Sequence, residues 1–279
     1  MLTDYHLHLR PDDHDATVAE YHVEGNAERY RAAASERGIA ELGVSEHIYR
    51  FREALEIWQH PFWETYAHDD MGEYVEFVRT RTDLRLGIEA DFVPGAEDRT
   101  ANVLDRHALD YVVGSVHFIR HGAVDMDLFS AWDAGQSVQE IWRRYFETVG
   151  ESAVSGLFDI IAHPDLVKYW GPRDRPLPEG DLRRYYEIAV EGIAESGAAV
   201  ELSTAGLRKP VGEMYPAPAF LEMCLEAGIP IALSSDAHRP EDVGAGYDQA
   251  LELLSELGVG ELCVFEGRER RLEPIGASE

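Results

Sequence analysis

Residues 3–8 read Thr-Asp-Tyr-His-Leu-His, and the rest of the sequence repeats this plan of a short strand that ends in metal-binding side chains. Because side chains alternate along a β-strand, His6 and His8 are expected to point to the same face. Two imidazoles in parallel at the end of a strand can bind a metal ion from one side. His14 follows in the next loop, so the N-terminus alone offers three candidate ligands.

Six further apolar runs are predicted to be strands, and segments with helical periodicity separate them. The strands are expected at residues 40–45, 84–88, 110–116, 158–162, 199–202 and 229–233, and the helices at 26–37, 71–81, 96–107, 138–154, 179–196, 218–227 and 241–257. The strands are continuous apolar runs, as is typical of a parallel sheet buried on both faces. Seven βα units with short connections predict an α/β protein with a closed barrel, and an open doubly wound sheet is the alternative.

No internal repeat, low-complexity stretch or linker divides the chain, so residues 1–279 are expected to form one domain. Residues 49–69 interrupt the βα pattern with a long insert. The insert is rich in aromatic residues and histidine: Trp58, His60, Phe62, Trp63 and Tyr66. We predict a lid over a binding site, and a loop that packs its own aromatic side chains is the alternative.

The chain is strongly acidic, since 25 basic and 53 acidic residues give a formal net charge of −28. Proteins that bind nucleic acids or anionic membranes normally present a basic face, so neither partner is expected. Cys224 and Cys263 form no CxxC pair, which favours a reducing compartment. The N-terminus lacks an apolar signal-peptide core, and no apolar run reaches the roughly 20 residues of a membrane span. We therefore expect a cytoplasmic protein.

Side chains that can bind metal follow six of the predicted strands, at the end where barrel enzymes build their active sites. These candidate ligands are His6, His8, His14, His47, Glu89, His117, His163, Asp236 and His238. Each has an ordinary explanation alone: His163 precedes a proline and can be a turn residue, and Glu89 or Asp236 can cap a helix. Together, without cations, they would form a costly cluster of desolvated polar groups. The set therefore predicts a metal centre.

The number of candidate ligands exceeds what one ion needs, because transition ions with nitrogen and oxygen ligands take about four to six. The set fits two or three divalent ions that share Glu89 as a bridge. Zinc, manganese and iron are all compatible with these ligands, and the lack of cysteine ligands argues against a structural thiolate site. Asp4, two residues before His6, either orients a ligand imidazole or is a surface carboxylate.

The strand ends carry an ordered series of motifs. They are Asp4-Tyr5-His6-Leu7-His8 with His14, Ser45-Glu46-His47, Gly87-Ile88-Glu89, Gly114-Ser115-Val116-His117, Ala162-His163-Pro164-Asp165 and Ser235-Asp236-Ala237-His238. The series resembles that of the PHP (polymerase and histidinol phosphatase) family. Within this family, residues 203–210 and 236–244 resemble the monofunctional histidinol-phosphate phosphatase branch.

The resemblance implies a distorted (β/α)7 TIM-like barrel that holds a trinuclear metal centre. One ion would be bound by His6, His8, Glu89 and Asp236. The second would be bound by Glu89, His117 and His163, and the third by His14, His47 and His238. Residues 118–125 differ from the Trp-Gly-Phe-Asp motif expected for the family, and this difference leaves the identity of the substrate open.

Such a centre suits hydrolysis of phosphate monoesters, because coordination lowers the pKa of water enough to supply hydroxide near neutral pH. The branch implies L-histidinol phosphate as the substrate and a step of histidine biosynthesis. Asp236, His238 or a coordinated water would protonate the leaving alkoxide. Arg208 is the predicted phosphate contact, because its planar group fits two phosphoryl oxygens, and a surface charge is the alternative. Lys209 and Arg239 are further candidates.

Three alternative functions stay open at this point. The chain can act on another small phosphate ester or a nucleotide, or it can be a PHP module that binds metal without catalysis. A metal-dependent amidohydrolase barrel also opens with a His-x-His motif, but it normally uses a lysine on a central strand. Lys168 and Lys209 are the only lysines, and neither lies at the end of a predicted strand. The amidohydrolase alternative is therefore the weakest.

Overall fold

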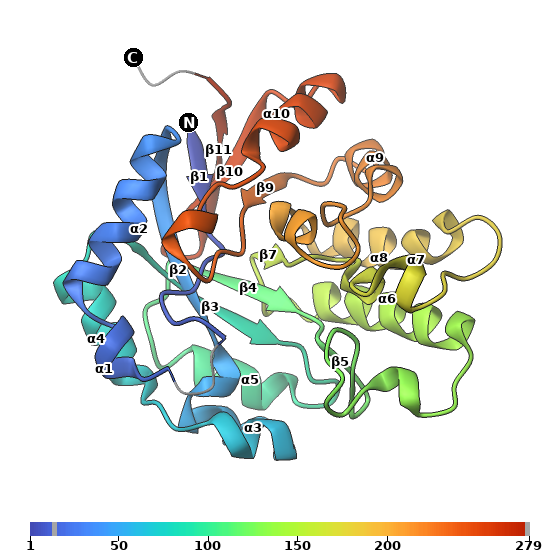
Figure 1. Ribbon diagram of the computed structural model, residues 1–279, viewed down its shortest axis with the longest axis horizontal. Coiled ribbons are helices and arrows are strands. Elements are labelled where there is room, and N and C mark those ends of the chain that lie inside the picture. The colour runs from blue at the N-terminus through green and yellow to red at the C-terminus, as the bar shows by residue number, and fades with distance from the viewer. Residues whose placement is uncertain (13–15, 277–279) are drawn as a thin grey trace.

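A computed structural model describes residues 1–12 and 16–276 of the chain. Seven strands form one parallel sheet in their order along the chain (Figure 1). They are β1 (Leu2–Asp4), β2 (Ile39–His47), β3 (Arg85–Asp91), β4 (Tyr111–Ser115), β7 (Ile160–Ile161), β8 (Ala199–Ser203) and β9 (Ile231–Ser234). The first and last strands meet where Leu7 pairs in parallel with Ala237. The sheet is thus a nearly closed, distorted barrel, which confirms the predicted TIM-like fold.

Helices lie around the outside of the barrel (Figure 1). They are α1 (Val18–Tyr21), α2 (Glu24–Glu36), α3 (Pro61–Tyr66), α4 (Met71–Arg81), α5 (Glu97–Leu104), α6 (Val138–Val154), α7 (Gly171–Asp174), α8 (Arg183–Ser196), α9 (Pro218–Glu226) and α10 (Tyr247–Glu256). The helix α6 begins at a capping box, in which Ser137 and Glu140 bind each other's backbone amides. None of the described helices is long and apolar enough to cross a membrane.

Short elements connect the main ones. They are the 3₁₀ turns η1 (Ile48–Arg50), η2 (Arg52–Glu56), η3 (Ala131–Asp133), η4 (Leu166–Lys168), η5 (Thr204–Arg208) and η6 (Pro240–Asp242), with the hairpins of β5 (Phe118–Ile119) and β6 (Gly122–Ala123) and of β10 (Glu261–Glu266) and β11 (Glu269–Pro274). The predicted short strand near residues 262–265 is part of β10. It is longer than expected because it pairs along its whole length with β11.

Aromatic side chains fill the amino-terminal end of the barrel. Tyr5 and Tyr111 pack edge to face with ring centroids 5.0 Å apart, and Phe265 from β10 lies 5.5 Å from Tyr5. Gly87 makes room for this packing, because a Cβ at that position would lie 2.3 Å from Cζ of Tyr111. The barrel is therefore a packed core at this end, and the carboxyl ends of the strands remain for a site.

The insert at residues 49–69 is ordered and packs into the body of the protein. Trp63 is fully buried, and Phe62 contacts Phe118 with ring centroids 5.9 Å apart. An ion pair between Arg10 and Asp69 ties the insert to the loop that follows β1. Its aromatic side chains thus pack against the body of the protein, and a role of the insert as a lid stays a prediction.

Candidate metal centre

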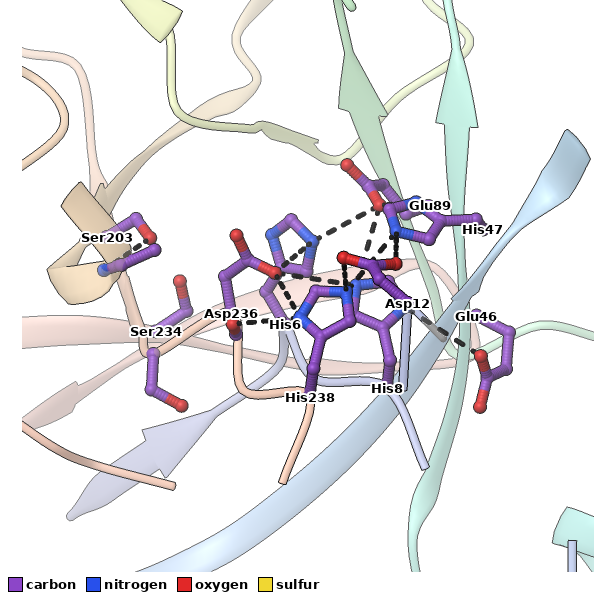
Figure 2. A network of polar contacts seen from close by, with 12 residues as sticks. His6, His8, Asp12, Glu46, His47, Glu89, Ser203, Ser234, Asp236 and His238 are labelled. Atoms are coloured by element: carbon purple, nitrogen blue, oxygen red, sulfur yellow. Dashed lines mark hydrogen bonds and ion pairs between the residues drawn. The ribbon is translucent and has the colours of Figure 1, made fainter. Parts of the chain in front are cut away.

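Glu89 lies at the middle of the candidate ligands, on β3. Its Oε2 is 3.4 Å from Nε2 of His6 and 3.5 Å from Nε2 of His8, and it also contacts Nδ1 of His47 (Figure 2). Its Oε1 is 3.2 Å from Nε2 of His163 and 3.5 Å from Nε2 of His117. One carboxylate therefore meets five imidazoles from four strand ends, as the shared position in the predicted centre requires.

The candidate ligands form three groups whose donor atoms lie within 4.8 Å of one another. The groups are His6, His8 and Glu89; Glu89, His117 and His163; and His8, His47 and His238. Asp236 adjoins the first group, since its Oδ1 is 3.8 Å from Nε2 of His6 and 3.5 Å from Nε2 of His8. His14, the remaining predicted ligand, lies outside the described residues.

Several donor atoms of these groups fit metal ions because they are buried and have no hydrogen-bond partner. Nε2 of His6, Nε2 of His8 and Oε2 of Glu89 have no hydrogen-bond partner among the described residues. Leaving a buried polar atom unpaired costs roughly 1–3 kcal/mol, and more when the group is charged. Divalent cations would satisfy all of these atoms at once, and nitrogen and oxygen donors of this kind suit zinc, manganese and iron.

Two further carboxylates each lie behind one imidazole and fix its orientation. Oε1 of Glu201 is 2.7 Å from Nδ1 of His6, and Oδ1 of Asp91 is 2.8 Å from Nδ1 of His117. These contacts leave Nε2 of each ring free to face the centre, as is usual for histidines that bind metal. Glu201 also accepts a hydrogen bond of 2.6 Å from the backbone N–H of His163. It thereby positions residues from two different strand ends.

The close packing of acids and imidazoles shifts the ionisation of both in the metal-free protein. Burial alone would lower the pKa of His117, but Asp91 and Glu89 raise it to about 10. Burial would raise the pKa of Glu89, but the neighbouring imidazoles hold it well below its ordinary range. The metal-free cluster therefore holds protons at neutral pH, and metal ions would displace them.

The loop after β9 is held from both sides. Asp4 accepts hydrogen bonds from the backbone N–H of Ser235, at 3.1 Å, and from its hydroxyl. Arg208 donates to the carbonyl oxygens of Ser235, at 2.7 Å, and of Asp236, at 3.2 Å. Asp4 also accepts a bond of 3.4 Å from the backbone N–H of His6 rather than from its ring. The expectation that Asp4 orients an imidazole is therefore wrong, and Asp4 instead positions the backbone that carries Asp236.

Asp12 is a site residue that the sequence interpretation missed. Its Oδ2 is 3.2 Å from Nε2 of His238, and its Oδ1 is 3.6 Å from Nε2 of His47. The two imidazole nitrogens are themselves 3.4 Å apart. Three residues whose donor atoms face one another at such distances can share one cation. Figure 2 shows the Asp12 carboxylate beside these rings.

A cavity of about 430 Å³ opens beside the centre. One side is formed by the candidate ligands, and much of the other by apolar and aromatic side chains. The cavity wall includes Glu89, His117, His163, Asp236 and His238, and also Tyr49, Phe62, Phe118, Leu128, Tyr169, Trp170 and Tyr215. Lys209 lines this cavity, whereas Arg208 and Arg239 line an adjoining hollow that also borders Lys209 and Asp236. Of the three predicted phosphate contacts, the structure thus brings Lys209 to the cavity itself.

Comparison with known families assigns the chain, because the profile of the PHP domain matches residues 17–205. The chain belongs to the PHP family. A PHP relative from Deinococcus radiodurans, called a probable histidinol-phosphatase, is 35% identical over 98% of this chain and 99% of its own length. The histidinol-phosphatase of Bacillus subtilis is 28% identical over 68% of this chain and 75% of its own length.

Solved structures support the barrel assignment for this PHP chain. The histidinol phosphate phosphatase of Lactococcus lactis superposes with a TM-score of 0.74 at 18% identity, over 97% of this chain and 98% of that one. That structure contains zinc, L-histidinol and phosphate. A putative histidinol phosphatase from Listeria monocytogenes gives a TM-score of 0.70 at 23% identity, over 88% and 99% of the two chains. At these identities the likeness establishes the fold.

Proposed function

We propose that this PHP protein is a metal-dependent phosphomonoesterase that hydrolyses L-histidinol phosphate to L-histidinol and phosphate in histidine biosynthesis. The observation that carries the proposal is Glu89, which touches five imidazoles at the wall of a cavity large enough for a small phosphate ester. The names of the relatives support the choice of substrate. A small substrate of this kind, without nucleic acid or membrane, also suits the acidity of the chain and a place in the cytoplasm.

Two or three divalent ions would be held by the groups described above. The first ion would take His6, His8, Glu89 and Asp236, and the second Glu89, His117 and His163. The third ion would be bound by His47, His238 and the predicted His14. We add Asp12 to this set as a ligand that supplies oxygen. Zinc is favoured because the Lactococcus relative contains it, and manganese and iron suit the same donors.

Divalent ions held there acidify water to a nucleophile near neutral pH and neutralise charge on the phosphoryl group. The chain's own residues supply orientation and proton transfer. Lys209 lies at the cavity and offers its ammonium group to a phosphoryl oxygen. Nδ1 of His238 is 3.5 Å from Oδ1 of Asp236, and these two side chains, with a coordinated water, are the candidates for the proton that the leaving alkoxide needs. Glu89 holds the ligand sets together.

Release of phosphate from a panel of esters tests the proposal. The metal-loaded protein is assayed with L-histidinol phosphate, a sugar phosphate, a nucleoside monophosphate and p-nitrophenyl phosphate. We expect kcat/KM for L-histidinol phosphate to exceed the others by about tenfold or more, since a built pocket discriminates by several contacts. A higher kcat/KM for another ester would replace the substrate, and no phosphate release from any ester at full metal content would identify a non-catalytic module.

A further inference from the structure

Asp125 presents a carboxylate at the cavity that the catalytic proposal does not use. Its Oδ1 is buried and has no hydrogen-bond partner among the described residues. Burial of an unpaired carboxylate costs desolvation free energy, so such a group normally binds a cation or a hydrogen-bond donor. Asp125 belongs to none of the three ligand groups found in the described part of the chain. We therefore expect the carboxylate of Asp125 to pair with a molecule that binds in the cavity.

The position of Asp125 is fixed by the residue before it. The N–H of Val124 donates to the carbonyl of His117 at 2.9 Å. The carbonyl of Val124 accepts hydrogen bonds from two indoles, Nε1 of Trp132 at 2.8 Å and Nε1 of Trp170 at 2.9 Å. Three bonds from three parts of the chain thus hold this backbone beside a candidate ligand. Because this backbone is fixed, the side chain of Asp125 extends from a fixed point and is preorganised to bind a group at one place.

The charges near Asp125 do not complete it once metal is bound. The side chains nearby that can carry positive charge are His117, His163 and Lys209. His117 and His163 belong to the second ligand group, so their nitrogens would serve a metal ion rather than Asp125. The charge of Lys209 is shared among Asp236, Asp12 and Asp125, so one ammonium group serves three carboxylates. Asp125 thus lines the cavity without a cation of its own.

We propose that Asp125 binds the ammonium group of the substrate and so selects amino-alcohol phosphates over neutral esters. The inference rests on the proposed function and deepens it. In such a substrate the amine is carried by the carbon next to the ester carbon, so it lies close to the phosphate. The aromatic and apolar wall near Phe118 and Trp170 then receives the rest of the molecule. The ammonium group, the phosphate and the aromatic ring of the substrate would thus each contact a suitable part of the cavity.

The test compares two substrates that differ only in the amine, L-histidinol phosphate and 3-(imidazol-4-yl)propyl phosphate. We expect Asp125→Asn to lower kcat/KM for L-histidinol phosphate by about 10- to 100-fold, the loss typical of a charge-assisted bond. Activity on the analogue without the amine should change by less than about threefold. The ratio of the two values does not depend on how much of the variant is folded, so it stays informative if the variant is unstable.

Asp127→Asn is the matched control, because Asp127 lines the same cavity and its side chain is 84% exposed. It removes the same charge two residues away and should leave the ratio unchanged. An equal loss on both substrates, or no loss on L-histidinol phosphate, would overturn the role of Asp125 while leaving the proposed function standing. If the unmodified protein hydrolyses neither ester, the proposed function fails first and the inference with it. As a second readout, binding of L-histidinol in the presence of phosphate should weaken in Asp125→Asn alone.

Discussion

At the scale of single residues, Glu89 carries more of the candidate centre than any other side chain described here. It belongs to two of the three ligand groups, and it is almost completely buried. A carboxylate in this position balances the charge of cations on both sides. Its removal should therefore affect more than one ion.

Replacing Glu89 with alanine should abolish turnover, with a loss of about a thousandfold or more, because ions and their positioning are lost together. Metal content, measured by elemental analysis, should fall by at least one ion per chain. Glu76→Ala, on the exposed face of α4, serves as the control and should change neither value. A Glu89→Ala protein with full metal content and normal activity would refute the bridging role.

The candidate ligands other than His14 could be predicted from the sequence because each one lies at or just after the end of an apolar strand. His47 and Glu89 lie in the last residues of β2 and β3, so their place at the rim follows from the strand itself. Asp12 and Asp91 were missed because their contacts arise only when separate loops and strands meet. Glu201 had a visible signal, since a charged residue inside a fully buried strand needs a buried partner.

At the scale of elements, Arg208 at the end of η5 and Lys209 directly after it have different contacts. Lys209 lines the cavity, whereas Arg208 donates to the backbone of Ser235 and Asp236. Of these two adjacent basic side chains, one therefore reaches the cavity and the other stabilises the loop after β9. We therefore propose Lys209, which was a further candidate beside Arg208, as the phosphate contact.

We expect Lys209→Ala to raise KM for phosphate esters by about tenfold or more at unchanged metal content, because a charge-assisted contact is lost. Arg208→Ala is the neighbouring comparison. It should weaken metal binding, because the loop that carries Asp236 loses its anchor. Steady-state kinetics with elemental analysis on both variants separates the roles. A higher KM with full metal content in Arg208→Ala would return the phosphate contact to that residue.

The insert at residues 49–69 is predicted to close further over the cavity when substrate binds. Tyr49 and Phe62 line the cavity, and the ion pair between Arg10 and Asp69 provides an anchor at the end of the insert. Hydrogen exchange of these amides, measured with metal alone and with metal plus phosphate and L-histidinol, should slow by about tenfold or more in the second state. Equal exchange in both states would show that the insert is a fixed wall.

Helix and strand positions followed from the sequence, but their lengths did not. The apolar run at residues 158–162 predicts a full strand, yet β7 spans Ile160–Ile161 alone, although the backbone of Asp159 and of Ala162 also bonds to β4. Strand length depends on which backbone atoms meet a partner, and the local sequence does not contain this information. The expected helix at residues 179–196 begins at Arg183 instead. Element ends are decided by capping and packing, which vary from site to site.

At the scale of the whole molecule, the barrel separates a packed end from a reactive end. Tyr5, Tyr111 and Phe265 fill the amino-terminal end, and the acids and imidazoles gather at the other. In the metal-free molecule, imidazoles at this end of the barrel therefore carry protons at neutral pH. Its stability should depend on pH in a way that metal ions abolish.

The pKa of His117 is raised to about 10 in the metal-free protein. A raised folded-state pKa stabilises the protein fully below the unfolded value of about 6.5, and this contribution is lost as the pH rises through the folded value. The thermal midpoint of the chelated protein should thus fall by several degrees between about pH 6.5 and 9. The metal-loaded protein should not show this decline, because ions replace the protons. A midpoint of the chelated protein that is flat or rises over this range would contradict the assignment.

The central claim is that the strand-end acids and imidazoles hold divalent ions that hydrolyse L-histidinol phosphate. It is tested by elemental analysis and phosphate release on one sample, before chelation, after chelation and after zinc or manganese is restored. We predict two or three ions per chain, activity that disappears when they are removed, and recovery in proportion to the ions returned. A protein that turns over the ester equally well without metal, or that binds no ions at these residues, would contradict the claim.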